Sequence, residues 1–109
     1  MGEEAATGPT GQADLAAVRA CIDRLDEELV RLLALRQVQV SRAASLKEDA
    51  AAVHAPARQA EVIGRVRSMA TAEGLDPDVA EQIWRAMIAG FVALELREHE
   101  AARAADDRR

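Results

Sequence analysis

The sequence predicts an all-α protein, and the prediction rests on one long amphipathic stretch and on composition. From residue 15 to about residue 51 the chain contains no proline and no glycine. The 109 residues include one Phe, one Trp and no Tyr, and a chain so poor in aromatic residues favours helices over sheets. Within the stretch, apolar residues recur at steps of three and four, the period of one helical face, at Leu15, Val18, Ile22, Leu25, Leu29 and Leu32.

Two further helices are predicted after this stretch. Pro56 suits the first turn of a helix that ends before Gly74, a residue typical of helix C-termini. Residues 76–78, Asp-Pro-Asp, form the clearest helix start in the chain, with an N-cap, a proline at the first position and an acid in the first turn. Residues 53–55 are the expected loop before Pro56, because a proline biases its predecessor away from helical geometry. The third helix carries Glu95 on its apolar face.

These helices predict one domain between two tails. We expect a disordered tail over residues 1–13, a helical domain over residues 14–100 that begins at the N-cap Asp14, and a charged tail over residues 101–109. The first helix would be about 55 Å long and the second only about 25 Å, so part of the long apolar face would stay uncovered in one chain. The sequence therefore predicts three helices per chain in an intertwined antiparallel helical homodimer.

Composition excludes several classes of protein. A net charge of −5 argues against nucleic acid as the main partner. Cys21 is the one cysteine, which excludes an intrachain disulfide and fits the reducing cytosol, and no run resembles a signal peptide or a membrane span. Cys21, His54 and His99 lack metal-ligand spacing, and neither a phosphate-binding glycine loop nor a nucleophile elbow is present. We expect a cytoplasmic protein without metal or cofactor.

Two cations interrupt the apolar face of the first helix. The next positions at the spacing of that face are Arg36, Val40, Ala43 and Lys47. Arg36 and Lys47 lie about 20° apart around a helix axis. One interpretation is that their stems cover the face while their charged ends reach water or pair with acids. The other is a pocket for an anion, which a compact point charge such as Lys47, the one lysine among fourteen basic residues, would suit. Glu95 is likewise either a solvated or salt-bridged acid, or the counterpart of these cations.

Arg19 connects the anion pocket with the dimer. It precedes Arg36 by 17 residues, which is about 25 Å along a helix, so no small ligand can touch both within one chain. In an antiparallel dimer, Arg19 of one chain approaches the Arg36–Lys47 segment of the other. The sequence thus predicts a small-ligand site that is shared between two chains.

The order and spacing of these residues resemble the small all-helical chorismate mutase family over about residues 14–98. No single motif is specific, whereas all of them together, in this order, are. The motifs are Val18-Arg19-x-x-Ile22-Asp23-x-Leu25-Asp26-x-x-Leu29, Leu32-Leu33-Ala34-x-Arg36, Lys47, Pro56-x-Arg58 and Gly74-Leu75-Asp76.

The resemblance implies a fold, an activity and a set of roles. Members of this family are intertwined dimers with two equivalent sites, and they rearrange chorismate to prephenate in the shikimate pathway without a cofactor. It implies that Arg36, Arg58 and the partner's Arg19 bind the two carboxylates of the substrate. It also implies that Lys47 donates a hydrogen bond to the ether oxygen of the breaking bond, and that Glu95 lies on the other side of that oxygen.

The substrate ring would be met by Gln59 and an apolar lining. By the same resemblance, the lining consists of Val40, Ala43, Ala55, Val62, Ile88, Phe91 and Val92. Three positions depart from the common pattern of the family: Gln59 replaces Glu, Ala55 stands where many members have Asp, and Phe91 where a small hydroxyl residue is common. Because all three would surround the ring, the substrate is less well determined than the fold.

The implied reaction explains why these residue types are needed. The breaking C–O bond places negative charge on the ether oxygen, and fixed donors aimed at it lower the barrier. Arginine forks suit carboxylates and hold a flexible substrate in its reactive shape. No general base is required. Glu95 can donate to the ether oxygen only when it is protonated.

Three alternatives stay open. Residues 45–58 also resemble the isochorismate-pyruvate lyases of salicylate biosynthesis, which share this fold. A third relative rearranges 4-amino-4-deoxychorismate for antibiotic precursors in secondary metabolism, and Gln59 suits a ring amine or a ring hydroxyl equally well. A non-catalytic helical dimerisation or regulatory module is the alternative from another class. The cations on the apolar face argue against it, because a pure interaction module would gain from leucine there.

Overall fold

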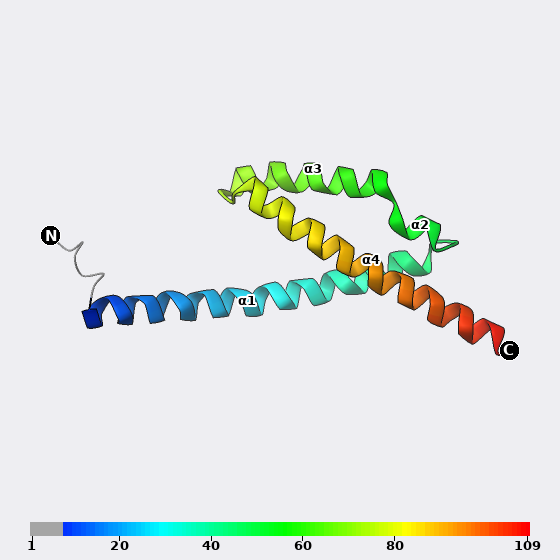
Figure 1. Cartoon of the computed structure of the whole chain (residues 1–109), viewed down its shortest axis with the longest axis horizontal. Helices are drawn as coiled ribbons and strands as arrows, with labels where there is room; N and C mark the ends of the chain where they lie inside the picture. The colour runs from blue at the N-terminus through cyan, green and yellow to red at the C-terminus, as the bar shows by residue number, and fades with distance from the viewer. Residues whose placement is uncertain (1–7) are drawn as a thin grey trace. The chain divides into compact units, whose positions relative to one another are not determined.

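The computed structural model describes residues 8–109 and confirms the all-α fold (Figure 1). Its long helices are α1 (Gly8–Ser45), α3 (Pro56–Glu73) and α4 (Pro77–Asp107), and a single turn of helix, α2 (Ala51–His54), precedes α3. The chain divides into two compact units, one ending at Arg36 and the other comprising residues 37–109. α1 contributes to both units, which are described separately below.

The N-terminal unit consists of α1 alone in the part of the chain that the structure describes. α1 begins at Gly8, six residues before the expected N-cap Asp14. Of the tail expected over residues 1–13, the first seven lie outside the described residues and the others are helical. The earlier start is compatible with Pro9, because the first turn of a helix does not use its backbone N–H groups for intrahelical hydrogen bonds.

The apolar face of α1 is about half exposed. Its six members at the predicted spacing are between 48% and 63% exposed: Leu15, Val18, Ile22, Leu25, Leu29 and Leu32. Leaving this much apolar surface in water forgoes most of the stabilisation that burial of such side chains provides. This half of α1 therefore has the apolar face of a packed amphipathic helix and the exposure of an unpartnered one.

The C-terminal end of α1 differs from the sequence-based prediction. We expected the helix to continue to about residue 51, but it ends at Ser45. Of the expected loop at residues 53–55, the first two residues belong to α2. The hydroxyl of Ser45 donates to the carbonyl of Arg42 at 2.7 Å, and the carboxylate of Asp49 accepts from the N–H of Ala52 at 3.0 Å. Such local bonds compete with a continuous helix. Lys47 consequently lies in the turn after α1 and not in helical phase with Arg36.

α3 and α4 form an antiparallel hairpin that contains the core of the C-terminal unit (Figure 1). The core consists of Val62, Val66, Ala70 and Ala80, with Trp84 and Ile88 packed against it. In each helix these residues recur every four positions, which is the spacing of one helical face. The hairpin fixes the position of α4, which carries Glu95.

The turn between α3 and α4 confirms the predicted helix signals. α3 begins at Pro56 and ends at Gly74, whose left-handed φ of 77° is readily adopted only by glycine. The N–H of Leu75 bonds to the carbonyl of Ala70 at 2.8 Å, which completes a Schellman cap. Asp76 then caps α4 by accepting from the next two free N–H groups at 2.8 and 3.2 Å.

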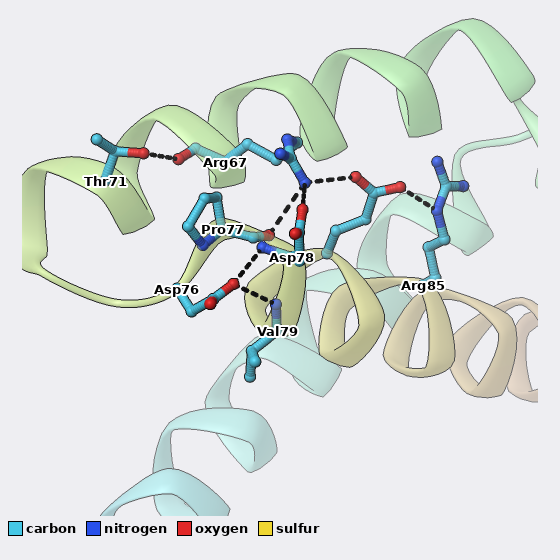
Figure 2. A network of polar contacts seen from close by, with 8 residues as sticks. Arg67, Thr71, Asp76, Pro77, Asp78, Val79 and Arg85 are labelled. Atoms are coloured by element: carbon cyan, nitrogen blue, oxygen red, sulfur yellow. Dashed lines mark hydrogen bonds and ion pairs between the residues drawn. The ribbon is translucent and has the colours of Figure 1, made fainter.

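A charged network braces this turn from the α3 side (Figure 2). The guanidinium of Arg67 donates to the carbonyl of Pro77 at 3.2 Å and to the carboxylates of Asp78 and Glu81 at 3.0 Å each. The other oxygen of Glu81 accepts from Nε of Arg85 at 2.7 Å. The hydrogen bond from Arg85 is the main reason that the pKa of Glu81 lies below its ordinary value, and the bond to Asp78 raises the pKa of Arg67.

The lowered pKa of Glu81 predicts a pH-dependent effect of Glu81→Gln on stability. Because folding favours the ionised carboxylate, its contribution is present above the unfolded-state pKa and is lost as the pH falls through the lower folded-state pKa. We expect the variant to melt below the wild type at about pH 7 and to converge with it towards about pH 3. Thermal unfolding followed by circular dichroism measures this, with the exposed Glu100→Gln as control. An equal loss at both pH values would contradict the prediction.

α4 extends further than the sequence indicated. Residues 101–109 were expected to form a tail, but the helix continues to Asp107. Within residues 8–109, none of the helices combines the length and apolarity needed to traverse a lipid bilayer.

Candidate active site

Lys47 and Glu95 form an ion pair inside the C-terminal unit. Nζ of Lys47 lies 3.1 Å from Oε1 of Glu95. Glu95 is the one buried charged residue among the described side chains, at 5% exposure, and Lys47 is half-buried. A buried carboxylate is tolerated only with a partner that compensates its lost hydration, so the pair holds the ammonium group in a defined place.

The turn that carries Lys47 is fixed by its backbone and by α4. The N–H of Lys47 donates to the carbonyl of Ala44 at 3.1 Å, and Nε2 of His99 lies 3.0 Å from the same carbonyl oxygen. One turn earlier on α1, the hydroxyl of Ser41 donates to the carboxylate of Glu98 at 3.0 Å. Lys47 is therefore attached to α4 directly through its side chain and indirectly through the carbonyl of Ala44, which its N–H shares with His99.

A hollow of about 600 Å³ adjoins Lys47 on this side of α4. Most of its lining comes from the end of α1 and from the C-terminal half of α4, and the charged or polar members include Ser41, Lys47, Glu48, Glu98, His99, Arg103 and Asp106. Its lining combines apolar surface with two cations and three carboxylates. It is large enough for a small organic molecule beside the ammonium group.

A second hollow, of about 450 Å³, lies between α3 and the middle of α4. It brings together three of the predicted ring-contact residues, Gln59, Ile88 and Val92. Ile63 and Ala89 add apolar surface, whereas His54 and Arg85 add polar groups. This combination of apolar walls with few polar groups is typical of small-molecule sites.

The geometry of Gln59 depends on a strained residue. Ala55 has φ 31° and ψ 62°, the left-handed region, where a residue with a Cβ pays about 1 kcal/mol or more. This conformation lets the carbonyl of Ala55 accept from the N–H of Gln59 at 3.0 Å, and the side-chain amide of Gln59 donates to the carbonyl of His54. One N–H of the amide is thereby used, which leaves its oxygen and its second N–H for a ligand.

The other predicted site residues of the C-terminal unit are more dispersed. Arg58 is exposed and pairs with Glu61 one turn later. Val62 is part of the buried core. Val40 and Phe91 are half-buried, and Ala43 is exposed. None of these five lines either hollow.

Arg19 and Arg36, the predicted carboxylate ligands of α1, belong to the N-terminal unit. Arg19 is exposed and Arg36 is half-buried. The 17 residues between them lie in one continuous helix, so their Cα atoms are about 25 Å apart along its axis. The separation expected from the sequence holds, and so does the argument that one small ligand cannot bind both within a chain.

The prediction from the sequence did not include two residues of the candidate site. His99 is four residues after Glu95 and therefore on the same face of α4, but it lies beside the expected tail and was considered only as a metal ligand. Arg85 lines the second hollow and is oriented by Glu81. Arg85 lies one turn before Ile88 and therefore on the same side of α4. Including charged residues in the predicted helix face would have placed it near that hollow.

The arrangement can do two things chemically. The ammonium of Lys47, held by a buried carboxylate and a braced turn, is a fixed donor that can stabilise negative charge on a ligand oxygen. The amide of Gln59 can hydrogen-bond a polar group on an apolar ring in the second hollow. Neither of these two interactions involves a nucleophile or a proton relay.

Comparison with known proteins gives two matches. The sequence model of a family described as chorismate mutase type II matches residues 18–96, which include all the predicted site residues and exclude His99. The chain is also similar to the isochorismate pyruvate lyase of Pseudomonas aeruginosa, with 30% identity over 97 residues. That alignment covers 89% of this chain and 96% of the relative.

Proposed function

Because this chain belongs to the chorismate mutase type II family, we propose that it is a pericyclic enzyme that rearranges chorismate to prephenate. The reaction is intramolecular. The ether C–O bond between the ring and the enolpyruvyl side chain breaks while a C–C bond forms, and no atom enters or leaves. The protein supplies binding and electrostatic stabilisation, and no cofactor takes part in the proposal.

The observation that carries this proposal is the contact between Lys47 and Glu95. As the C–O bond lengthens, negative charge develops on the ether oxygen, and an ammonium group on a fixed turn stabilises it after only a small opening of its contact with Glu95. In the proposed complex the ether oxygen takes a hydrogen bond from Lys47, and Glu95 lies on its other side. The nearly complete burial of Glu95 supports a dry site, in which such an interaction is stronger than in water.

A second candidate is isochorismate pyruvate lyase, and the similarity to that enzyme over most of both chains favours it. There the same ether C–O bond breaks, and a ring hydrogen moves to the side chain, so that salicylate and pyruvate leave. Lys47 would stabilise the same oxygen in both reactions. A rearrangement of 4-amino-4-deoxychorismate differs only in the ring substituent that Gln59 would meet.

The proposed enzyme is a homodimer with sites shared between its chains. The half-exposed apolar face of α1 supports a second copy of the chain as the covering partner. An antiparallel pairing would bring Arg19 of the partner subunit towards Arg36 and Lys47. The arginines would then bind the two carboxylates of the substrate, with the bidentate geometry that guanidinium groups offer.

A three-substrate assay tests the function. Chorismate, isochorismate and 4-amino-4-deoxychorismate are each incubated with the purified protein, and the products are identified by chromatography. Prephenate supports the mutase, salicylate with pyruvate supports the lyase, and 4-amino-4-deoxyprephenate supports the amino-substrate mutase. Turnover of none of the three would overturn the enzyme proposal in favour of a helical dimerisation module. Lys47→Ala, purified in the same way, controls for a contaminating activity.

Glu95→Gln gives a pH test of the proposed mechanism. If Glu95 donates to the ether oxygen, it must be protonated, so wild-type turnover should fall from the acidic to the alkaline end of the assayed pH range. Glutamine is a permanent donor of nearly the same shape, so the variant should keep its activity at the alkaline end. Initial rates of both proteins across this range measure the effect. A flat wild-type profile with a Gln variant that is inactive throughout would show that an ionised Glu95 only pairs with Lys47.

A further inference from the structure

Three contacts join the end of α1 and the following turn to consecutive positions on one face of α4. Lys47 Nζ meets Glu95 at 3.1 Å, the carbonyl of Ala44 meets Nε2 of His99 at 3.0 Å, and Ser41 meets the carboxylate of Glu98 at 3.0 Å. All of these residues belong to the C-terminal unit. The middle contact is the one that acts on the backbone of the turn.

The carbonyl of Ala44 holds the turn together. It accepts the N–H of Lys47 at 3.1 Å, and the preceding carbonyl, of Ala43, accepts the N–H of Leu46 at 3.1 Å. These bonds span three residues, a tighter and weaker pattern than that of the α-helix. Ala44 is only 2% exposed, so its carbonyl has little access to water as a further donor. A second donor from the protein is therefore worth more here than at an exposed helix end.

His99 supplies that donor. A carbonyl oxygen can only accept, so Nε2 of His99 must carry the proton in this contact, whether the ring is the neutral Nε2–H tautomer or the imidazolium. His99 lies one turn after Glu95 on α4. The same helix face thus holds the ammonium of Lys47 through Glu95 and its backbone through His99.

We propose that His99 is a positioning residue that fixes the Lys47 turn, so that the ammonium group is in place when the substrate binds. The inference rests on the proposed function, because it assigns His99 a role in a reaction at Lys47. A lysine side chain has four rotatable bonds and reaches a defined point only if its backbone is fixed as well. His99 also lines the hollow beside the ammonium group, but in this assignment it acts on the reaction through Lys47 and not on the reacting atoms.

The kinetics of two His99 variants, one of them also combined with Lys47→Ala, test the proposal. His99→Leu removes the donor, and we expect kcat to fall about tenfold, the effect of one lost hydrogen bond, with KM nearly unchanged. His99→Gln places an amide N–H near the former Nε2, so it should retain most of kcat. In a Lys47→Ala background, His99→Leu should cause no further loss, because the group that it positions is absent. Glu100→Leu, at the exposed neighbouring position, is the matched control.

Three kinetic outcomes would overturn the proposal. Equal losses from His99→Leu with and without Lys47 would mean that the imidazole acts directly or through general stability. A His99→Gln variant as poor as His99→Leu would mean that the hydrogen bond is not what matters. A rise in KM at unchanged kcat would assign His99 to substrate binding.

Amide hydrogen exchange provides a readout that needs no activity. The N–H of Lys47 is protected by the Ala44 carbonyl, so its exchange in the wild type reports the closed turn. We expect His99→Leu to speed this exchange about tenfold, and His99→Gln and Glu100→Leu to leave it near the wild-type rate. Unchanged exchange in His99→Leu would overturn the positioning role. If the wild type turns over none of the three substrates, the proposed function fails, and this experiment still decides whether His99 fixes the turn.

Discussion

Lys47→Ala should lower kcat/KM at least about 100-fold, which corresponds to about 3 kcal/mol of lost transition-state stabilisation. The variant removes the donor that faces the ether oxygen in the proposed mechanism. Lys47→Arg should also be poor, because a planar guanidinium is bulkier than an ammonium group and cannot occupy the same point beside Glu95. Steady-state kinetics with the substrate identified in the three-substrate assay measure both variants.

Stability has to be separated from catalysis in this experiment. Removing one partner of a buried ion pair leaves the other uncompensated, so Lys47→Ala is expected to be less stable as well. Rates are therefore compared at a temperature at which circular dichroism shows both proteins folded. Arg42→Ala, which removes an exposed cation from the last turn of α1, is the matched control and should keep its activity. A Lys47→Ala variant within threefold of the wild type would contradict the proposed role.

Arg19→Ala and Arg36→Ala should each abolish activity alone and restore part of it when mixed. In the proposed shared site, Arg36 of one chain acts with Arg19 of the partner subunit. A mixed dimer then has one site with both arginines and one site with neither. Random exchange makes about half of the dimers mixed, so about a quarter of the wild-type activity per chain should return.

The mixing experiment also examines assembly. Sedimentation should give about twice the 11.7 kDa chain mass, and subunit exchange is verified with a mass-tagged copy. Arg24→Ala, an exposed arginine of the same helix whose guanidinium donates to the sulfur of Cys21, serves as the matched control. If verified exchange restores no activity, Arg19 does not act across the interface. A folded and active monomer would remove the basis of the shared site.

Helix ends with strong chemical signals were predictable from the sequence. Pro56 and Asp76 each favour the start of a helix, and Gly74 favours the end of one. α3 begins and ends, and α4 begins, where these residues predict. The effect is local, so neighbouring residues suffice to determine it. The end of α1 had no such signal. It depends on the hydroxyl of Ser45 and the carboxylate of Asp49, whose competition with the helix is not visible in a period of apolar residues.

The sequence identified candidate site residues by their chemical type. It did not predict the contacts that depend on where a helix ends. The salt bridge between Lys47 and Glu95 is one of the interpretations that the sequence left open for Glu95, although Lys47 was expected on a helix and the structure places it in a turn. His99 was missed because its role depends on where α4 ends. The part of Arg19 and Arg36 in the site stays a prediction, since it depends on a second chain that no feature of a single chain can position.

The uneven distribution of buried residues has a consequence for the order of folding events. All the described side chains that are buried belong to residues 44–95, whereas the apolar face of α1 lies before them. The α3–α4 hairpin joins residues that are close in the sequence, so it can form quickly and at any protein concentration. In the proposed dimer, the α1 face must wait for an encounter, and the rate of encounters rises with concentration. At low concentration the chain would therefore stay as a partly folded monomer whose α1 exposes its apolar face to water. The lifetime of this monomer determines how long it is exposed to proteases and chaperones.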